Sequence, residues 1–121
     1  MRIFKQKSFH QWAKSEKLSD RMLKQAIDEI EKDLYEANLG SNLYKKRIAS
    51  PGKGKRGGYR TLIAFKTNEK AFFLYGFAKN VRDNIDEKEQ RVYRKLARDM
   101  LAMSAQDIQK LVNDGKLFEV I

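Results

Sequence analysis

Residues 43–79 read LYKKRIASPGKGKRGGYRTLIAFKTNEKAFFLYGFAK. Alternation at the start and apolar runs further on predict three strands, over Leu43–Ala49, Tyr59–Lys66 and Ala71–Ala78. The second and third are largely apolar on both faces, so we expect them to be central strands with one face under helices. The four residues Thr67–Lys70 suit a hairpin, which predicts that these two strands pair antiparallel.

Cations crowd the first strand and the segment that follows it. They are Lys45, Lys46, Arg47, Lys53, Lys55, Arg56, Arg60 and Lys66, with no acid among them. Because such charges repel one another and gain nothing in a core, their concentration predicts a surface that binds a polyanion. On the first strand, Lys45 and Arg47 share one face, whereas Tyr44 and Ile48 share the other.

The segment before these strands predicts one short strand and two helices. Arg2–Lys5 is the expected strand, and Ser8 with Gln11 has the spacing of a capping box that opens a helix. Ser19 is expected to cap the second helix, and the polar segment 38–41 to end it. Its buried stripe recurs at helical spacing and comprises Leu23, Ile27, Ile30 and Leu34.

The segment after these strands predicts two more helices and a final strand. Asp86 with Glu89 has capping-box spacing and precedes an apolar row of Val92, Leu96 and Met100. Ser104 opens the next helix, Gly115 ends it, and Lys116–Ile121 alternates like a strand. The predicted order is β-α-α-β-β-β-α-α-β, an α+β fold with a small antiparallel-centred twisted sheet in one domain over residues 1–121.

Composition narrows the classes of function. The chain has 121 residues, 41% of them hydrophobic, and a formal net charge of +10, which favours nucleic acid or another polyanion as partner. No cysteine is present, which excludes disulfides and thiolate chemistry and fits a cytoplasmic protein. The single histidine, His10, excludes a multi-histidine metal site. We expect no membrane span and no signal peptide, because no apolar run is long enough.

The segment Pro51–Gly58 alternates glycine with cations. Glycine lets the backbone approach a phosphate and the cations supply charge, so we assign Lys53, Lys55 and Arg56 to substrate binding. The segment is not the P-loop of nucleotide triphosphatases, which needs Ser or Thr directly after its lysine. The alternative interpretation is a flexible hairpin loop that its charge keeps soluble.

Three more cations are predicted to meet at one end of the sheet. Arg60 begins an otherwise apolar strand, and we expect its guanidinium to face solvent, where it can bind a phosphate through two nitrogens. Lys79 and Arg82 lie just beyond the strand Ala71–Ala78. Because antiparallel pairing puts the end of that strand beside the start of its neighbour, these three residues are the candidate catalytic group.

Three motifs in this order resemble one family. They are Gly58-Tyr59-Arg60 before an apolar strand, FLYGFAKNVRDNI at residues 73–85, and DGKLFEV at residues 114–120. Together they resemble the RelE/ParE superfamily of bacterial toxins, and most closely its HigB-like RelE branch. The resemblance runs from about Leu43 to the end, and the earlier helical part agrees in the order of elements.

The resemblance implies a ribosome-dependent mRNA endonuclease that an antitoxin, a small helix-turn-helix DNA-binding protein, holds silent. Such cleavage uses the 2′-hydroxyl of the RNA and works without a metal or cofactor. The resemblance assigns the transition-state role to Arg60, the paired substrate-binding cations to Lys45 and Arg47, and the strand-end lysine to Lys79.

The chain departs from the RelE pattern at two positions. Asn80 stands where RelE has an arginine, so Arg82 must substitute for it, and Asp86 stands where RelE has a tyrosine. Either Tyr93 supplies the aromatic ring or none takes part. Two other functions stay open: a ParE-like toxin that inhibits DNA gyrase without catalysis, and a basic RNA-binding module.

Overall fold

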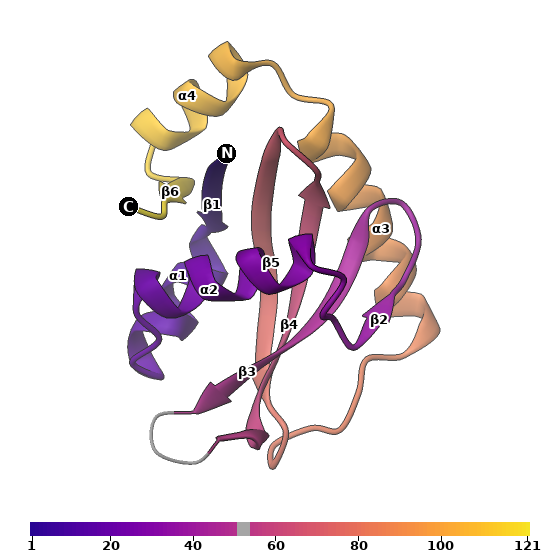
Figure 1. The fold of residues 1–121 in the computed structure, drawn as a ribbon. Helices are drawn as coiled ribbons and strands as arrows, with labels where there is room; N and C mark the ends of the chain where they lie inside the picture. The colour runs from indigo at the N-terminus through magenta and orange to yellow at the C-terminus, as the bar shows by residue number, and fades with distance from the viewer. Residues whose placement is uncertain (51–53) are drawn as a thin grey trace.

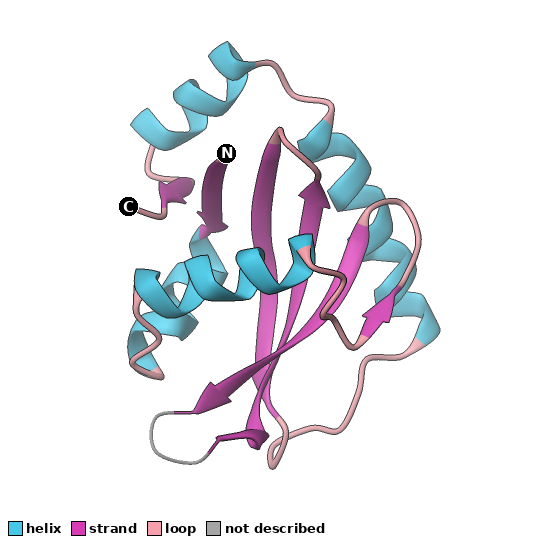
Figure 2. Cartoon of the chain, in the orientation of Figure 1, coloured by secondary structure: helices cyan, strands magenta, loops and turns pink. Residues whose placement is uncertain are grey.

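The computed structural model describes the backbone of residues 1–50 and 54–121, and the side chains of residues 1–50 and 58–121. Within these residues a six-stranded sheet has the order β2-β3-β4-β5-β1-β6 (Figures 1 and 2). The strands are β1 (Arg2–Gln6), β2 (Ala37–Asn38), β3 (Leu43–Ser50), β4 (Gly54–Lys66), β5 (Lys70–Ala78) and β6 (Leu117–Glu119). The helices are α1 (Lys7–Ser15), α2 (Asp20–Glu31), α3 (Glu87–Leu101) and α4 (Ala105–Asn113). The predicted α+β class is confirmed.

The antiparallel strands β3, β4 and β5 form the centre of the sheet, as predicted. β4 begins at Gly54, so residues 54–58 belong to a strand and not to the expected loop. The β3–β4 ladder shifts its register between Ile48 and Ser50, and there the two backbones approach closely. A Cβ on Gly58 would lie 2.2 Å from the carbonyl oxygen of Ile48, so this glycine is required by strand packing.

Helices cover both faces of the sheet, whereas one covered face was expected. Figure 1 shows α2 crossing one face of the sheet while α3 lies against the other. On the first face, Phe9 of α1 and Leu23 of α2 pack in one apolar core with Phe73 of β5. On the second, Ala97 of α3 packs in another core with Leu62 of β4. Burying such side chains is the main driving force for this three-layer arrangement.

The two N-terminal helices test two predicted caps. Ser19 does cap α2, since its hydroxyl accepts a hydrogen bond from the Met22 N–H at 3.3 Å. The capping box at Ser8 is wrong, because β1 runs directly into α1 and the N-cap position is Gln6. α2 also ends earlier than expected, at Glu31, and Leu34 is 56% exposed.

The segment after α2 becomes a strand because it finds a partner at the edge of the sheet. Ala37 pairs with Lys45 and Asn38 with Tyr44, which makes β2 a short antiparallel addition to β3. No residue pattern marks a strand of two residues, and this pairing overrides the helical spacing that continues through Leu34.

The capping box of α3 is confirmed in both directions. Asp86 Oδ1 accepts from the Glu89 N–H at 2.8 Å, and Glu89 Oε1 accepts from the Asp86 N–H at 3.2 Å. The predicted buried row is only partly correct. Met100 is buried, but Val92 is 64% exposed and Ala97 takes the central core position instead.

β1 forms the one parallel pairing of the described sheet, with β5 as its partner. It pairs in parallel with β5 from Arg2↔Lys70 to Lys5↔Phe73, and antiparallel with β6. β6 follows α4, which Ser104 caps through the Asp107 N–H at 3.1 Å. Gly115 has a φ of +71° just after α4, so the predicted helix end and the final strand are both confirmed. None of the helices in the described part of the chain has the length and apolar character that crossing a membrane requires.

Candidate functional site

Strand register brings three of the predicted site residues onto one face of the sheet. Arg47 of β3 lies opposite Arg60 of β4, and Arg60 lies opposite Phe77 of β5. Residues directly opposite one another share a face, and Lys45, two residues before Arg47, shares it too. Lys45 and Arg47 share a face as expected, and Arg60 joins them there, whereas the sequence had grouped Arg60 with Lys79 and Arg82.

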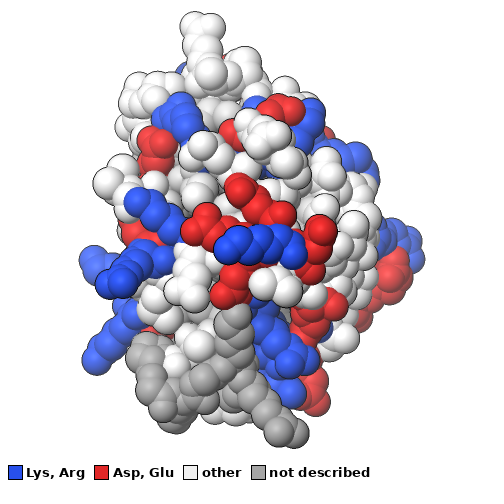
Figure 3. All heavy atoms as spheres, viewed as in Figure 1, with Lys and Arg blue, Asp and Glu red and all other residues white. Residues whose placement is uncertain are grey.

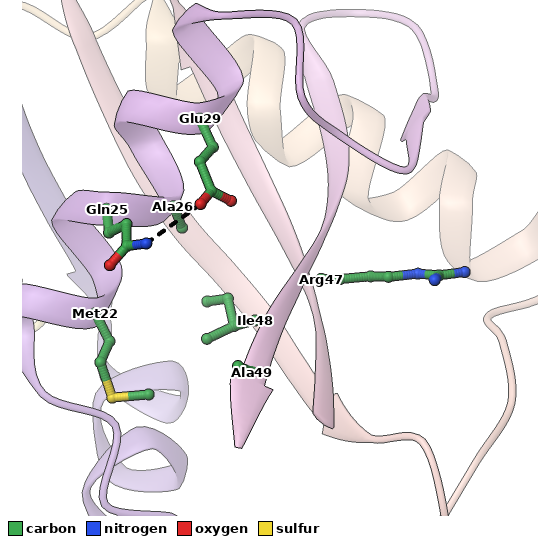
Figure 4. A pocket seen from close by; sticks show the side chains of 7 residues that line it. All are labelled: Met22, Gln25, Ala26, Glu29, Arg47, Ile48 and Ala49. Carbon is green, nitrogen blue, oxygen red and sulfur yellow. Dashed lines mark hydrogen bonds between the residues drawn. The ribbon is translucent and has the colours of Figure 1, made fainter. Parts of the chain in front are cut away.

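This cationic face is the one that α3 covers. Figure 4 shows Met22, Gln25 and Glu29 of α2 around a small hollow beside Ile48, while Arg47 extends away from them. The hollow measures about 70 Å³ and is too small for a nucleotide. Acidic side chains gather over α2 on the other face of the sheet, the α2 face (Figure 3). Lys46 lies on the α2 face, and its Nζ pairs with Glu29 Oε1 at 2.6 Å. The polyanion site is therefore expected on the opposite face.

A carboxylate that the sequence analysis missed lies at the centre of these cations. Glu36 Oε1 is 3.1 Å from Lys45 Nζ, Glu36 Oε2 is 3.3 Å from Arg60 Nε, and the same oxygen pairs with Arg47 Nε. The pairing of β2 with β3 places it there, because the Glu36 N–H donates to the Lys45 carbonyl at 2.8 Å. Counter-charge thus comes from the residue just before β2, and the expectation of unpaired cations was wrong for Lys45, Arg47 and Arg60.

The electrostatics of Glu36 favour its ionised form. Burial raises the pKa of the Glu36 carboxyl, but hydrogen bonds from Arg47 and Lys45 and the charge of Arg60 outweigh it. The net result is a pKa below the usual value of a glutamate. At neutral pH this side chain is an anion that fixes the three cations in place.

Arg60 is not solvent-facing, contrary to the sequence-based expectation. It lies well inside β4, which begins six residues earlier at Gly54, and is only 2% exposed. Its Nε contacts Glu36, and its NH1 donates to the Tyr59 carbonyl at 3.4 Å. An arginine can be buried when its charge is paired, so Arg60 forms the floor of the site.

Arg82 joins the same cluster from the segment after β5. Its guanidinium lies 5.7 Å from the centre of the Phe77 ring, and Phe77 is the cross-strand neighbour of Arg60. Asn84 connects the two sides, since its Oδ1 accepts from Lys45 Nζ at 2.9 Å and its carbonyl accepts from Arg82 Nε at 3.0 Å.

Arg82 also has a counter-ion of its own. Its NH1 donates to Glu89 Oε2 at 2.9 Å and to the Tyr75 hydroxyl at 3.2 Å. The hydrogen bond to Glu89 raises the pKa of Arg82, and its reciprocal effect lowers the pKa of Glu89. Four cations of the cluster therefore face two carboxylates, which leaves positive charge in excess for a phosphate.

Lys79 is exposed and directly follows β5. Its backbone N–H donates to the Gly58 carbonyl at 3.3 Å, which ties it to β4 two residues before Arg60. The other assigned binding residues, Lys53, Lys55 and Arg56, lie outside the residues whose side chains are described. Their assignment stays a prediction.

An aromatic pair adjoins Arg82. Tyr93 of α3 stacks on Tyr75 of β5 with 5.4 Å between ring centres, and Tyr75 accepts the hydrogen bond from Arg82. Burial raises the pKa of the Tyr93 hydroxyl, so it is neutral at pH 7. The sequence left open whether Tyr93 or no aromatic ring takes part. In the structure, Tyr93 is linked to the cation cluster through Tyr75, on which it stacks. Among the described residues, no group of three His, Cys, Asp or Glu could hold a metal ion.

Comparison with known families identifies the chain. A family model described as the RelE toxin of the RelE/RelB toxin–antitoxin system matches residues 1–120. The chain belongs to this family. It is thus a toxin of a toxin–antitoxin system, and the family implies an antitoxin partner. The match does not distinguish the HigB-like branch. No curated protein and no solved structure matches the chain.

Proposed function

We propose that this RelE toxin is a ribosome-dependent mRNA endonuclease that acts in the cytoplasm. The observation that carries the proposal is the row Arg47–Arg60–Phe77 across three strands, with Arg82 over the Phe77 ring. A rigid sheet that presents an excess of guanidinium groups suits the binding of a phosphate whose charge grows in the transition state. An inhibitor of a protein such as gyrase does not need such a group.

In the proposed reaction, the 2′-oxygen of a ribose attacks the adjacent phosphorus as its proton is removed. The bond from phosphorus to the 5′-oxygen breaks, that oxygen takes a proton, and the products end in a 2′,3′-cyclic phosphate and a 5′-hydroxyl. The protein must align the attacking oxygen and stabilise the doubly charged phosphorane. Arginine and lysine side chains suit that task.

We assign direct phosphate contact to Arg47, Arg82 and Lys79, whose side chains reach the surface, and to Lys45 at the rim. Arg60 lies deepest and stabilises the same charge from below, where low solvent access strengthens its field. Glu36 is a weak general base, because its pKa lies below the usual value and far from neutral pH. Its proposed role is to hold the cations in position.

The test uses purified ribosomes programmed with one defined mRNA, followed by analysis of the RNA ends. We expect cuts that leave a 2′,3′-cyclic phosphate and that a 2′-O-methyl group at the cleaved position abolishes. Arg82→Gln should lower the single-turnover rate about a hundredfold or more, the typical effect of losing one oriented charge contact. Arg91→Gln is the matched control, because Arg91 is an exposed α3 residue.

Two results would contradict the proposal. Intact mRNA together with inhibited DNA gyrase would indicate a ParE-like toxin. Ribosome binding that depends on Arg47 but yields no cleavage would indicate an RNA-binding module without catalysis.

A further inference from the structure

A second, larger cavity lies beside the cation cluster. It measures about 600 Å³, within the size range of ligand sites, and opens between α1, β5 and the middle of α3. Five aromatic side chains contribute to its lining: Phe9, Trp12, Tyr75, Phe77 and Tyr93. Phe77 completes it on the side of the cations. The proposed catalytic roles leave this cavity unexplained.

The cavity exists because β1 is shorter than β5. β1 pairs with β5 only as far as Phe73, and the chain then turns into α1. Beyond Phe73, Trp12 of α1 lies against the backbone of β5 at Gly76. A Cβ on Gly76 would lie 2.2 Å from Trp12 Cζ3, so only glycine permits this contact. One wall of the cavity is therefore an aromatic ring held on a strand.

The cavity is joined to the phosphate-binding group through two of its lining residues. The Tyr75 hydroxyl accepts a hydrogen bond from Arg82 NH1 at 3.2 Å, and the Arg82 guanidinium lies 5.7 Å from the centre of the Phe77 ring. A phosphate bound at Arg82 would therefore carry its attached base at the mouth of the cavity. Aromatic surfaces beside a cation are the usual arrangement for binding unpaired bases.

The polar lining indicates a base and not a second phosphate as the occupant. Glu16 contributes a carboxylate, which repels a phosphate but can accept a hydrogen bond from an exocyclic amine. Asn80 contributes an amide, which can donate to and accept from the edge of a base. Asn80 is also the residue that departs from the arginine of the family pattern.

We propose that this cavity binds one unpaired base of the RNA whose phosphate contacts Arg82. The proposal rests on the proposed function in one respect, that the partner is RNA. It adds that Trp12, Tyr75 and Tyr93 form a stacking site, and that Glu16 and Asn80 select the base.

The test separates base binding from cleavage. The probe is a fluorescently labelled single-stranded hexaribonucleotide in which every ribose is 2′-O-methylated, so that it cannot be cut. Removing one base at a time, while keeping every phosphate, should at one position lower the affinity of the toxin by about 5- to 150-fold. The intact probe should also quench the fluorescence of Trp12, the only tryptophan of the chain.

Tyr93→Leu supplies the second arm of the experiment. It should weaken binding of the intact probe by a similar factor but leave binding of the critical abasic probe unchanged, because both changes remove the same contact. Phe118→Leu is the matched control, since Phe118 stacks on His10 and does not line the cavity. It should behave as the unmodified toxin.

Three results would overturn the proposal. The first is equal affinity of the toxin for every abasic probe. The second is a loss of affinity in Tyr93→Leu that multiplies with the loss caused by base removal. The third is unquenched Trp12 fluorescence at saturating RNA. Quenching by the antitoxin but not by RNA would also overturn it and assign the cavity to a peptide. A toxin that binds the probe as expected but cuts no mRNA would refute only the proposed function.

Discussion

Glu36→Gln should destabilise the fold far more than the loss of an ordinary surface charge. The substitution keeps the shape of the side chain but removes the anion between three cations. Arg47 is about half exposed and water can compensate it, whereas the Arg60 side chain is 3% exposed and would stay buried without a charge partner. Breaking a buried pair from one side costs about 3–5 kcal/mol.

That cost is a large part of the total stability of a domain of this size, which is typically about 5–15 kcal/mol. Urea unfolding followed by the fluorescence of Trp12 measures it, with circular dichroism as a second probe of two-state behaviour. Glu87→Gln is the control, because Glu87 pairs with Arg94 but its side chain is 63% exposed, and we expect a loss of at most about 1 kcal/mol.

A second substitution tests whether the unpaired charge of Arg60 causes this loss of stability. Arg60→Met removes the buried charge but keeps much of the apolar volume, so the double variant Glu36→Gln/Arg60→Met should recover most of the stability lost in Glu36→Gln. If Glu36→Gln alone costs less than about 1 kcal/mol, Arg60 is effectively hydrated and does not form a buried floor of the site.

Three other perturbations have defined outcomes. Acid should destabilise the toxin, because folding lowers the pKa values of Glu36 and Asp20. Their ionised forms stabilise the fold above the unfolded-state pKa, and this stability is lost as pH falls through the folded-state pKa. Urea titrations at a series of pH values measure the loss. Gly76→Ala should cost about 1–3 kcal/mol in the same assay and shift Trp12 emission, because the new methyl group overlaps the indole; unchanged emission would contradict this. The third perturbation substitutes three cations together with Gln: Lys53, Lys55 and Arg56. The salt dependence of ribosome binding should then fall by about one unit of slope per lost phosphate contact. Single-turnover cleavage at saturating ribosome should survive.

Sequence patterns predict correctly those elements whose signals lie in adjacent residues. The hairpin of β4 and β5 follows from two apolar runs separated by a short polar segment, and the caps at Ser19, Asp86 and Ser104 follow from residues within one helical turn. The cap at Ser8 has the same spacing and fails, because the preceding strand fixes where the helix begins. Spacing alone cannot detect that competition.

The candidate site was predictable in its cations but not in its anions. Arg47 and Arg60 are visible as charges in strand patterns, and family resemblance selects them. Glu36 reaches them only through the pairing of Ala37 with Lys45, a contact that no local pattern encodes. The burial of Arg60 likewise follows from tertiary contacts, because β4 extends back to Gly54, Arg60 lies between β3 and β5, and its Nε contacts Glu36.

The position of β1 in the sheet has a consequence for synthesis on the ribosome. β1 is made before both of its neighbours: β5 supplies its parallel ladder at Lys70–Phe73, and β6 supplies the other at residues 117–119. Until those segments have been translated, both edges of β1 are unpaired and the indole of Trp12 has no strand on which to lie. The cationic strands β3 and β4 are adjacent in the chain and can pair earlier. A nascent toxin therefore brings Lys45, Arg47 and Arg60 together before the aromatic cavity beside them is complete.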